Sequence, residues 1–211
     1  VLTVSHRMIP FFSSRVLDNY EMVRPFWMLW LMLAGIVTHG CLQWLELSAY
    51  LWIVDFPLAA CAAYLSYHWG FMRSFQVSLL AVLHVSFAWL GVSMALYAVQ
   101  SLIYLLSGSL LLGLAPLHAL GIGFFAGMVL AMASRVTLGH SGRPLELDHF
   151  TWLLFLGFQA TAVIRILADV VPVIAPILYV AAGFVWLICF VLWAAKYAPI
   201  YWRQRVDGKP G

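Results

Sequence analysis

Three histidines lie inside long apolar segments of the chain and are its clearest candidates for chemistry: His39, His84 and His118. An ionisable side chain is costly inside a hydrocarbon layer, so it usually has a partner, a cofactor or a polar path beside it. Imidazole nitrogen is a good ligand for both iron and copper. The three positions therefore predict a metal or haem site, without choosing between the metals.

Depth along the helices distinguishes the pairs that these histidines can form. A rise of about 1.5 Å per residue separates His39 and His118 by about 5 Å in depth, but His84 and His118 by about 14 Å. One haem held by His39 and His118 is therefore favoured over one held by His84 and His118. The alternative for His84 is a buried imidazole that hydrogen-bonds to another helix.

Two charged side chains also fall inside apolar segments. Arg165 could bind the propionates of a haem, or form an ion pair with Asp169 four residues later on the same helix. Asp55 precedes Pro57 closely and must be paired or protonated at that depth. It could orient a ligating imidazole, relay protons, or bond the backbone that Pro57 leaves free.

Small residues near the histidines predict either helix packing or room for a flat ring. Gly121 lies one turn from His118 and removes bulk on that face. A separate stripe predicts a helix-packing seam, and it consists of Ala119, Gly123, Gly127 and Ala131. The stripe beside His84 could either pack closely or admit a porphyrin, and it consists of Ala81, Ala88, Gly91 and Ala95.

A basic loop follows the helix that carries His118. Arg135, His140 and Arg143 lie within nine residues, together with Gly139 and Gly142, which permit tight turns. One interpretation is a loop that ends the helix and sets its orientation in the membrane. The other is a second site, in which His140 is a ligand and the arginines hold propionates or another anion.

The composition predicts an all-α, polytopic transmembrane helix bundle. Hydrophobic residues make up 64% of the chain and charged residues 9%, which excludes an ordinary soluble domain. Six apolar segments are long enough to span a bilayer, namely 23–45, 47–67, 75–99, 116–138, 150–171 and 173–197. Segment 101–113 is too short, and we expect it to be interfacial or re-entrant, or to extend the fourth helix.

The positions of the basic residues predict that both termini are cytoplasmic. Lysine and arginine occur in alternate connections, at Arg7, Arg15, Arg24, Arg73, Arg135, Arg143, Lys196, Arg203, Arg205 and Lys209, with Arg165 as the exception. The chain then divides into a cytoplasmic segment 1–22, which we expect to be the end of a preceding helix, a six-helix domain 23–197 and a basic cytoplasmic tail 198–211. Since no nucleotide-binding or hydrolytic motif is present, no catalysed reaction is assigned.

Three motifs, in order along the chain, resemble those of one membrane-protein family. They are RMIPFF at 7–12, Leu83 and His84 followed by Ala88, Trp89 and Leu90, and HALGIGFFAGMVLAMASRVTLGHSGRP at 118–144. The sequence is similar to the NnrS family, whose members are haem- and copper-containing membrane proteins linked to nitric oxide stress. Family members carry further N-terminal membrane helices with their own histidine motifs, so we interpret this chain as the C-terminal half of such a protein or a truncated relative.

The resemblance implies a haem-binding, multi-pass protein of the bacterial inner membrane, with a role in nitrosative stress and denitrification. It implies haem of the b type, copper as a further metal, and nitric oxide as a gaseous ligand. We expect contacts with the bilayer and with the missing N-terminal helices or an oligomer partner, but none with nucleic acid. The expected metal ligands are His118, His84, His140 and His39, and the expected cofactor-binding residues are Arg135, Arg143, Arg165, Gly121 and Asp55.

Two other functions stay open at this point. One is a polytopic transporter, in which Asp55, Arg165 and the histidines line a buried polar pathway. The other is a structural subunit of a membrane assembly. An absorption spectrum of the purified protein distinguishes these from the first function, since only a haem protein has the strong haem band.

The distribution of basic residues makes a direct prediction about orientation. Reporter fusions after Leu45 and after Leu138 should report opposite compartments, with the fusion after Leu138 on the cytoplasmic side. A fusion after Tyr197 is the control and should agree with the one after Leu138. The same compartment for Leu45 and Leu138 would contradict the predicted topology.

Overall fold

The computed structural model describes residues 1–208, and every regular element in that part of the chain is helical, as the composition predicts. The α-helices are α1 (Leu2–Val16), α2 (Phe26–Trp44), α3 (Trp52–His68), α4 (Phe71–Ser74), α5 (Ser78–Ser107), α6 (Ala115–His118), α7 (Gly127–His140), α8 (His149–Val170) and α9 (Ala175–Tyr197). Short 3-10 turns are η1 (Ser48–Tyr50), η3 (Pro172–Ile174) and η4 (Ala198–Trp202). A π-helical segment, η2 (Ala119–Ala126), joins α6 to α7 without a break.

Five helical segments are long and apolar enough to cross a membrane, which confirms a polytopic bundle. They are Phe26–Trp44, Ser78–Ser107, Ala115–His140, His149–Val170 and Pro172–Trp202. The predicted segment 47–67 forms η1 and α3 instead of one long helix. Because α3 has only 17 residues, it falls short of the length of the other five.

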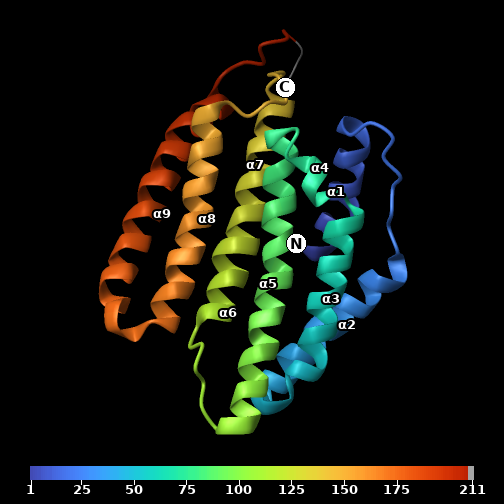
Figure 1. Cartoon of the computed structure of the whole chain (residues 1–211). Helices are drawn as coiled ribbons and strands as arrows, with labels where there is room; N and C mark the ends of the chain where they lie inside the picture. Colours follow the sequence, from blue (N-terminus) through green and yellow to red (C-terminus); the bar gives the residue numbers. More distant parts are fainter. Residues whose placement is uncertain (209–211) are drawn as a thin grey trace.

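Helix α5 lies at the centre of the bundle, with α8 and α9 on one side and α2 and α3 on the other (Figure 1). It has 30 residues and is the most deeply buried of the five membrane segments. The expectation of a separate interfacial segment at 101–113 is wrong, because Ser101–Ser107 continue α5. The helix ends at Gly108, whose φ of 68° lies in the left-handed region that favours glycine.

The N-terminal helix α1 packs along α5 through one face. Its buried residues include Ser5, His6, Ile9 and Ser13. His6 is 2% exposed and lies edge-on to Trp69, with the ring centroids 5.9 Å apart. The face exists because small polar side chains and one isoleucine recur at helical spacing.

The small-residue stripe on η2 and α7 forms the predicted packing seam against α5. All of its members are buried. A Cβ atom at Gly123 would overlap the Trp89 side chain, and one at Gly127 would lie 2.8 Å from the Ser86 hydroxyl. Glycine at these positions therefore sets the distance between the two helix backbones.

The start of α8 and the end of α9 are joined by polar contacts. Asp148 caps α8 by accepting from the Thr151 amide at 3.0 Å, and it pairs with Lys196 at 2.5 Å. Partial burial raises the pKa of Asp148, but the bonds from Lys196 and Thr151 outweigh that effect and lower it to about 2. The tail folds back here, because the Val206 amide donates to the Ser141 carbonyl. Lys209 lies outside the described residues.

The seam predicts a sharp difference between two glycine substitutions. Gly123→Ala should destabilise the protein by about 1–3 kcal/mol, because the added methyl must displace the Trp89 ring. Gly183→Ala is the control, because nothing lies within 4 Å of the Cβ position there. Thermal unfolding of both variants in detergent measures the difference, and equal melting temperatures would show that the seam tolerates a methyl group.

Candidate functional site

His118, at the end of α6, lies at the centre of a polar cluster between α6, α8 and α9. Its Nδ1 lies 2.6 Å from the Asp169 carboxylate, and its Nε2 lies 2.8 Å from the Arg165 guanidinium. Tyr179 donates its hydroxyl proton to the second Asp169 oxygen at 2.8 Å. The Arg165 guanidinium also lies 4.4 Å from the centre of the Tyr179 ring. Four side chains from three helices therefore satisfy one another.

This arrangement fixes the protonation of the imidazole. Arg165 can only donate, so Nε2 of His118 must accept and is unprotonated. The proton then resides on Nδ1 and is donated to Asp169. The expected ion pair between Arg165 and Asp169 is not among the salt bridges of residues 1–208; both side chains turn toward His118 instead.

The backbone that follows His118 is unusual. Residues 119–126 form a π-helix, a geometry that is rare and occurs frequently at functional sites. Gly121 lies in this segment, and nothing is within 4 Å of the position that its Cβ would occupy. The open space beside Gly121 agrees with the predicted lack of bulk one turn from His118.

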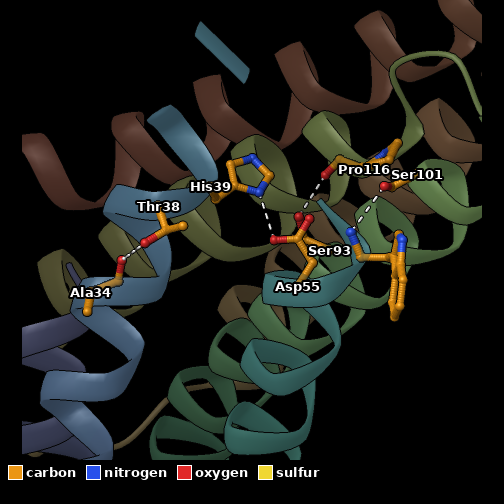
Figure 2. Close-up of polar contacts among 8 residues, drawn as sticks. Ala34, Thr38, His39, Asp55, Ser93, Ser101 and Pro116 are labelled. Carbon is orange, nitrogen blue, oxygen red and sulfur yellow. Dashed lines mark hydrogen bonds and ion pairs between the residues drawn. The ribbon is translucent and has the colours of Figure 1, made fainter. Parts of the chain in front are cut away.

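His39 forms a second carboxylate–histidine pair, with Asp55. The His39 Nδ1 lies 2.7 Å from Asp55 Oδ1, which joins α2 to α3 (Figure 2). Asp55 is fully buried, whereas the His39 side chain is 13% exposed. Tyr97 of α5 lies edge-on to the imidazole, with the ring centroids 4.8 Å apart. Asp55 therefore contacts an imidazole, which is one of the roles predicted from its position inside an apolar segment.

One atom of this second pair is left without a partner. Asp55 Oδ2 is buried and makes no hydrogen bond in the described part of the chain. Figure 2 shows Ser93 beside Asp55, but the Ser93 hydroxyl donates to the Pro116 carbonyl at 2.8 Å. A buried, unpartnered carboxylate oxygen is costly, so this position is suited to a proton or a ligand.

The two pairs are separate within residues 1–208, because no hydrogen bond or ion pair connects them. No group of three or more histidine, cysteine, aspartate or glutamate side chains is close enough there to hold a metal ion. A single haem between His39 and His118 thus stays a prediction.

His84 is a buried imidazole that contacts another helix, which is the alternative described above to a metal ligand. It is 2% exposed, and its Nε2 lies 3.0 Å from the Ser13 hydroxyl of α1. The neighbouring stripe packs closely at one point and borders open space at others, and its accommodation of a porphyrin stays a prediction. A Cβ at Gly91 would contact Ala62 at 3.4 Å, while Ala88, Gly91 and Ala95 also line an open groove that does not include His84.

The basic residues of the predicted second site point in different directions. The buried Arg135 guanidinium lies 3.8 Å from the centre of the Phe12 ring on α1. Arg143 has a buried Nη1 without a partner in the described chain, while His140 is exposed. No hydrogen bond or ion pair among residues 1–208 joins these three side chains, so the second site stays a prediction.

Sequence reasoning did not assign Tyr179, Tyr97 and Ser13 to these sites. No pattern reveals Tyr179, because it meets Asp169 only after the chain reverses between α8 and α9. The spacing of four residues from Arg165 was sufficient to identify Asp169 as a candidate. Its contact with His118 could not be predicted, because 51 residues separate the two.

The helices and buried polar pairs together define a polytopic membrane protein with ionisable groups in its interior. The family model described as NnrS protein matches residues 1–205, and the chain belongs to the NnrS family. This membership supports a membrane protein of the nitric oxide response. Comparison with curated proteins and with solved structures finds no match.

The cluster at His118 predicts a graded response at Tyr179. Tyr179→Phe removes the hydrogen bond to Asp169 and should cost about 0.5–1.5 kcal/mol. Tyr179→Leu also removes the ring beneath Arg165 and should cost more. Thermal unfolding of the purified variants measures both, with Tyr67→Phe as the control, because Tyr67 is exposed. Equal effects of Phe and Leu would exclude a contribution from the ring.

Proposed function

We propose that the protein binds haem of the b type at the bacterial inner membrane and thereby takes part in the nitric oxide response. The observation that carries this proposal is the pair of carboxylate–histidine contacts at His39 and His118. Histidines that ligate a metal almost always donate their other ring N–H to a carboxylate, a carbonyl or water. Both histidines are held in that way.

His39 fits the role of a ligand as it stands. Asp55 accepts from Nδ1, which leaves the lone pair of Nε2 for a metal ion. The Asp55 carboxylate also makes the imidazole a stronger donor toward iron or copper. Because Asp55 is buried on α3, the imidazole of α2 is held firmly in one orientation.

His118 fits the same role only if Arg165 moves. Its Nδ1 is held by Asp169, but its Nε2 accepts from the guanidinium. The guanidinium is well suited to a haem propionate, since its planar donors match a carboxylate. Arg165 would then exchange an imidazole contact for a propionate contact, and Nε2 would be free to ligate.

The chemistry that haem supplies when bound is the capture of nitric oxide by iron or the transfer of an electron. The chain's own contribution is orientation and charge. Asp55 and Asp169 hold the imidazole protons, and Arg165 supplies a fixed positive charge beside His118. Copper is the further metal, since imidazole ligates it as readily as iron.

Haem content of purified variants tests the proposal. His39→Ala and His118→Ala should each lower haem per protein while the protein still accumulates in the membrane. Asp55→Asn should weaken haem affinity by about 10–100-fold, the usual effect of changing a group that orients a ligand. His149→Ala is the control, because His149 is exposed at the start of α8.

The double variant distinguishes one site from two. If His39 and His118 share one haem, the double variant should lose no more haem than the more severe single variant. If each holds its own, the losses should add. Metal analysis of the same samples reports copper. Wild-type protein without a haem band, or full haem retention in both single variants, would refute the proposal.

A further inference from the structure

A large open groove lies between α3, α5 and the segment that links α1 to α2. Its volume is about 1100 Å³, which is above the usual range for small-molecule pockets. Neither carboxylate–histidine pair lines it. Because α5 is a membrane segment, most of the groove lies within the apolar part of the bundle.

The deep part of the groove is a narrow apolar track. Small side chains from two helices line it, namely Ala59, Ala60 and Ala63 from α3 and Ala88, Gly91 and Ala95 from α5. Along α3 the lining runs from Phe56 to His68, which corresponds to about 18 Å at 1.5 Å per residue. A track of this length and polarity accommodates a hydrocarbon tail.

The end of the groove near α4 is polar. Tyr20 and Ser66 line it, and their hydroxyl oxygens lie buried beneath its surface without a hydrogen-bond partner in the described part of the chain. His68 and Arg73 lie at the same end. Two buried hydroxyls without partners are costly, and a ligand with acceptor oxygens would satisfy them.

The walls of this end are rigidly held. The Trp69 indole N–H donates to the Val23 carbonyl at 2.9 Å, and Arg73 donates to the Asp18 carbonyl. The linking segment is therefore fastened to α3 and α4. The polar end exists as a preformed site.

The charges at this end favour a neutral head group over an anionic one. Arg73 and Glu21 both line the groove, so their charges offset each other. We propose that the groove binds a membrane quinone, with its ring carbonyls at the Tyr20 and Ser66 hydroxyls and its isoprenoid tail along the alanine track. A phospholipid phosphate would instead face the Glu21 carboxylate.

Polar side chains lie between this end of the groove and the interior. Burial raises the pKa of the Tyr20 hydroxyl, while the nearby Ser13 hydroxyl and Arg73 lower it. Ser13 in turn contacts His84 Nε2 at 3.0 Å.

Titration of the purified protein with decyl-ubiquinone, in nanodiscs of phosphatidylcholine, tests the site without reference to haem. The wild-type protein should bind saturably. Tyr20→Phe and Ser66→Ala should each weaken binding by several-fold to about tenfold, as expected for one hydrogen bond. Ala63→Leu should abolish binding by filling the track. The matched controls are Tyr64→Phe and Ala160→Leu, which lie outside the groove lining.

Three results would overturn the proposal. The first is quinone binding that Ala63→Leu and Tyr20→Phe leave unchanged. The second is displacement of the quinone by phosphatidylglycerol at equal concentration, which would assign the groove to an anionic lipid. The third is a loss of haem in Ala63→Leu that Ala160→Leu does not share, which would assign it to the porphyrin.

Discussion

The bundle depends on one constraint: an ionisable group inside an apolar bundle must find its partner within the chain or in a ligand. His118, Asp169, Arg165 and Tyr179 meet that constraint as a closed set, with every contact 2.8 Å or shorter among the hydrogen bonds. Each side chain lies on a different turn or helix, so the set also fixes how α6, α8 and α9 pack. The pair of His39 and Asp55 does the same for α2 and α3.

These two sites differ in what they leave unsatisfied. At His118 both ring nitrogens and both Asp169 oxygens have a partner, so a ligand of the imidazole must displace one. At Asp55 one carboxylate oxygen is buried without a partner, so a proton or ligand can be added there without breaking a contact. The first site is therefore the more stable of the two, and the second is the more ready to bind.

Composition and spacing were sufficient to predict the helical bundle and the seam at Gly123, and to single out His39, His118, Arg165 and Asp55, which lie in the two polar sites of the structure. They could not predict the partners of these residues. A helical pattern reports which face is apolar, but not which distant residue meets it, as with His118 and Asp169. The length of α5 was also misjudged, because Ser101 and Ser107 resemble a polar boundary in sequence. In the structure the Ser101 hydroxyl accepts from the Trp52 amide, which lies far away in sequence, and the Ser107 hydroxyl donates to the Ile103 carbonyl within the same helix.

The π-helical segment between His118 and α7 has a consequence for the register of the whole helix. Each residue of an α-helix turns the chain by about 100°. The wider turns of residues 119–126 therefore set the angle between the face that carries His118 and the face of α7 that packs on α5. If the same residues wound as a regular α-helix, His118 would be rotated about the helix axis relative to that face. The imidazole would then leave Asp169 and Arg165, although no residue of the cluster had been changed.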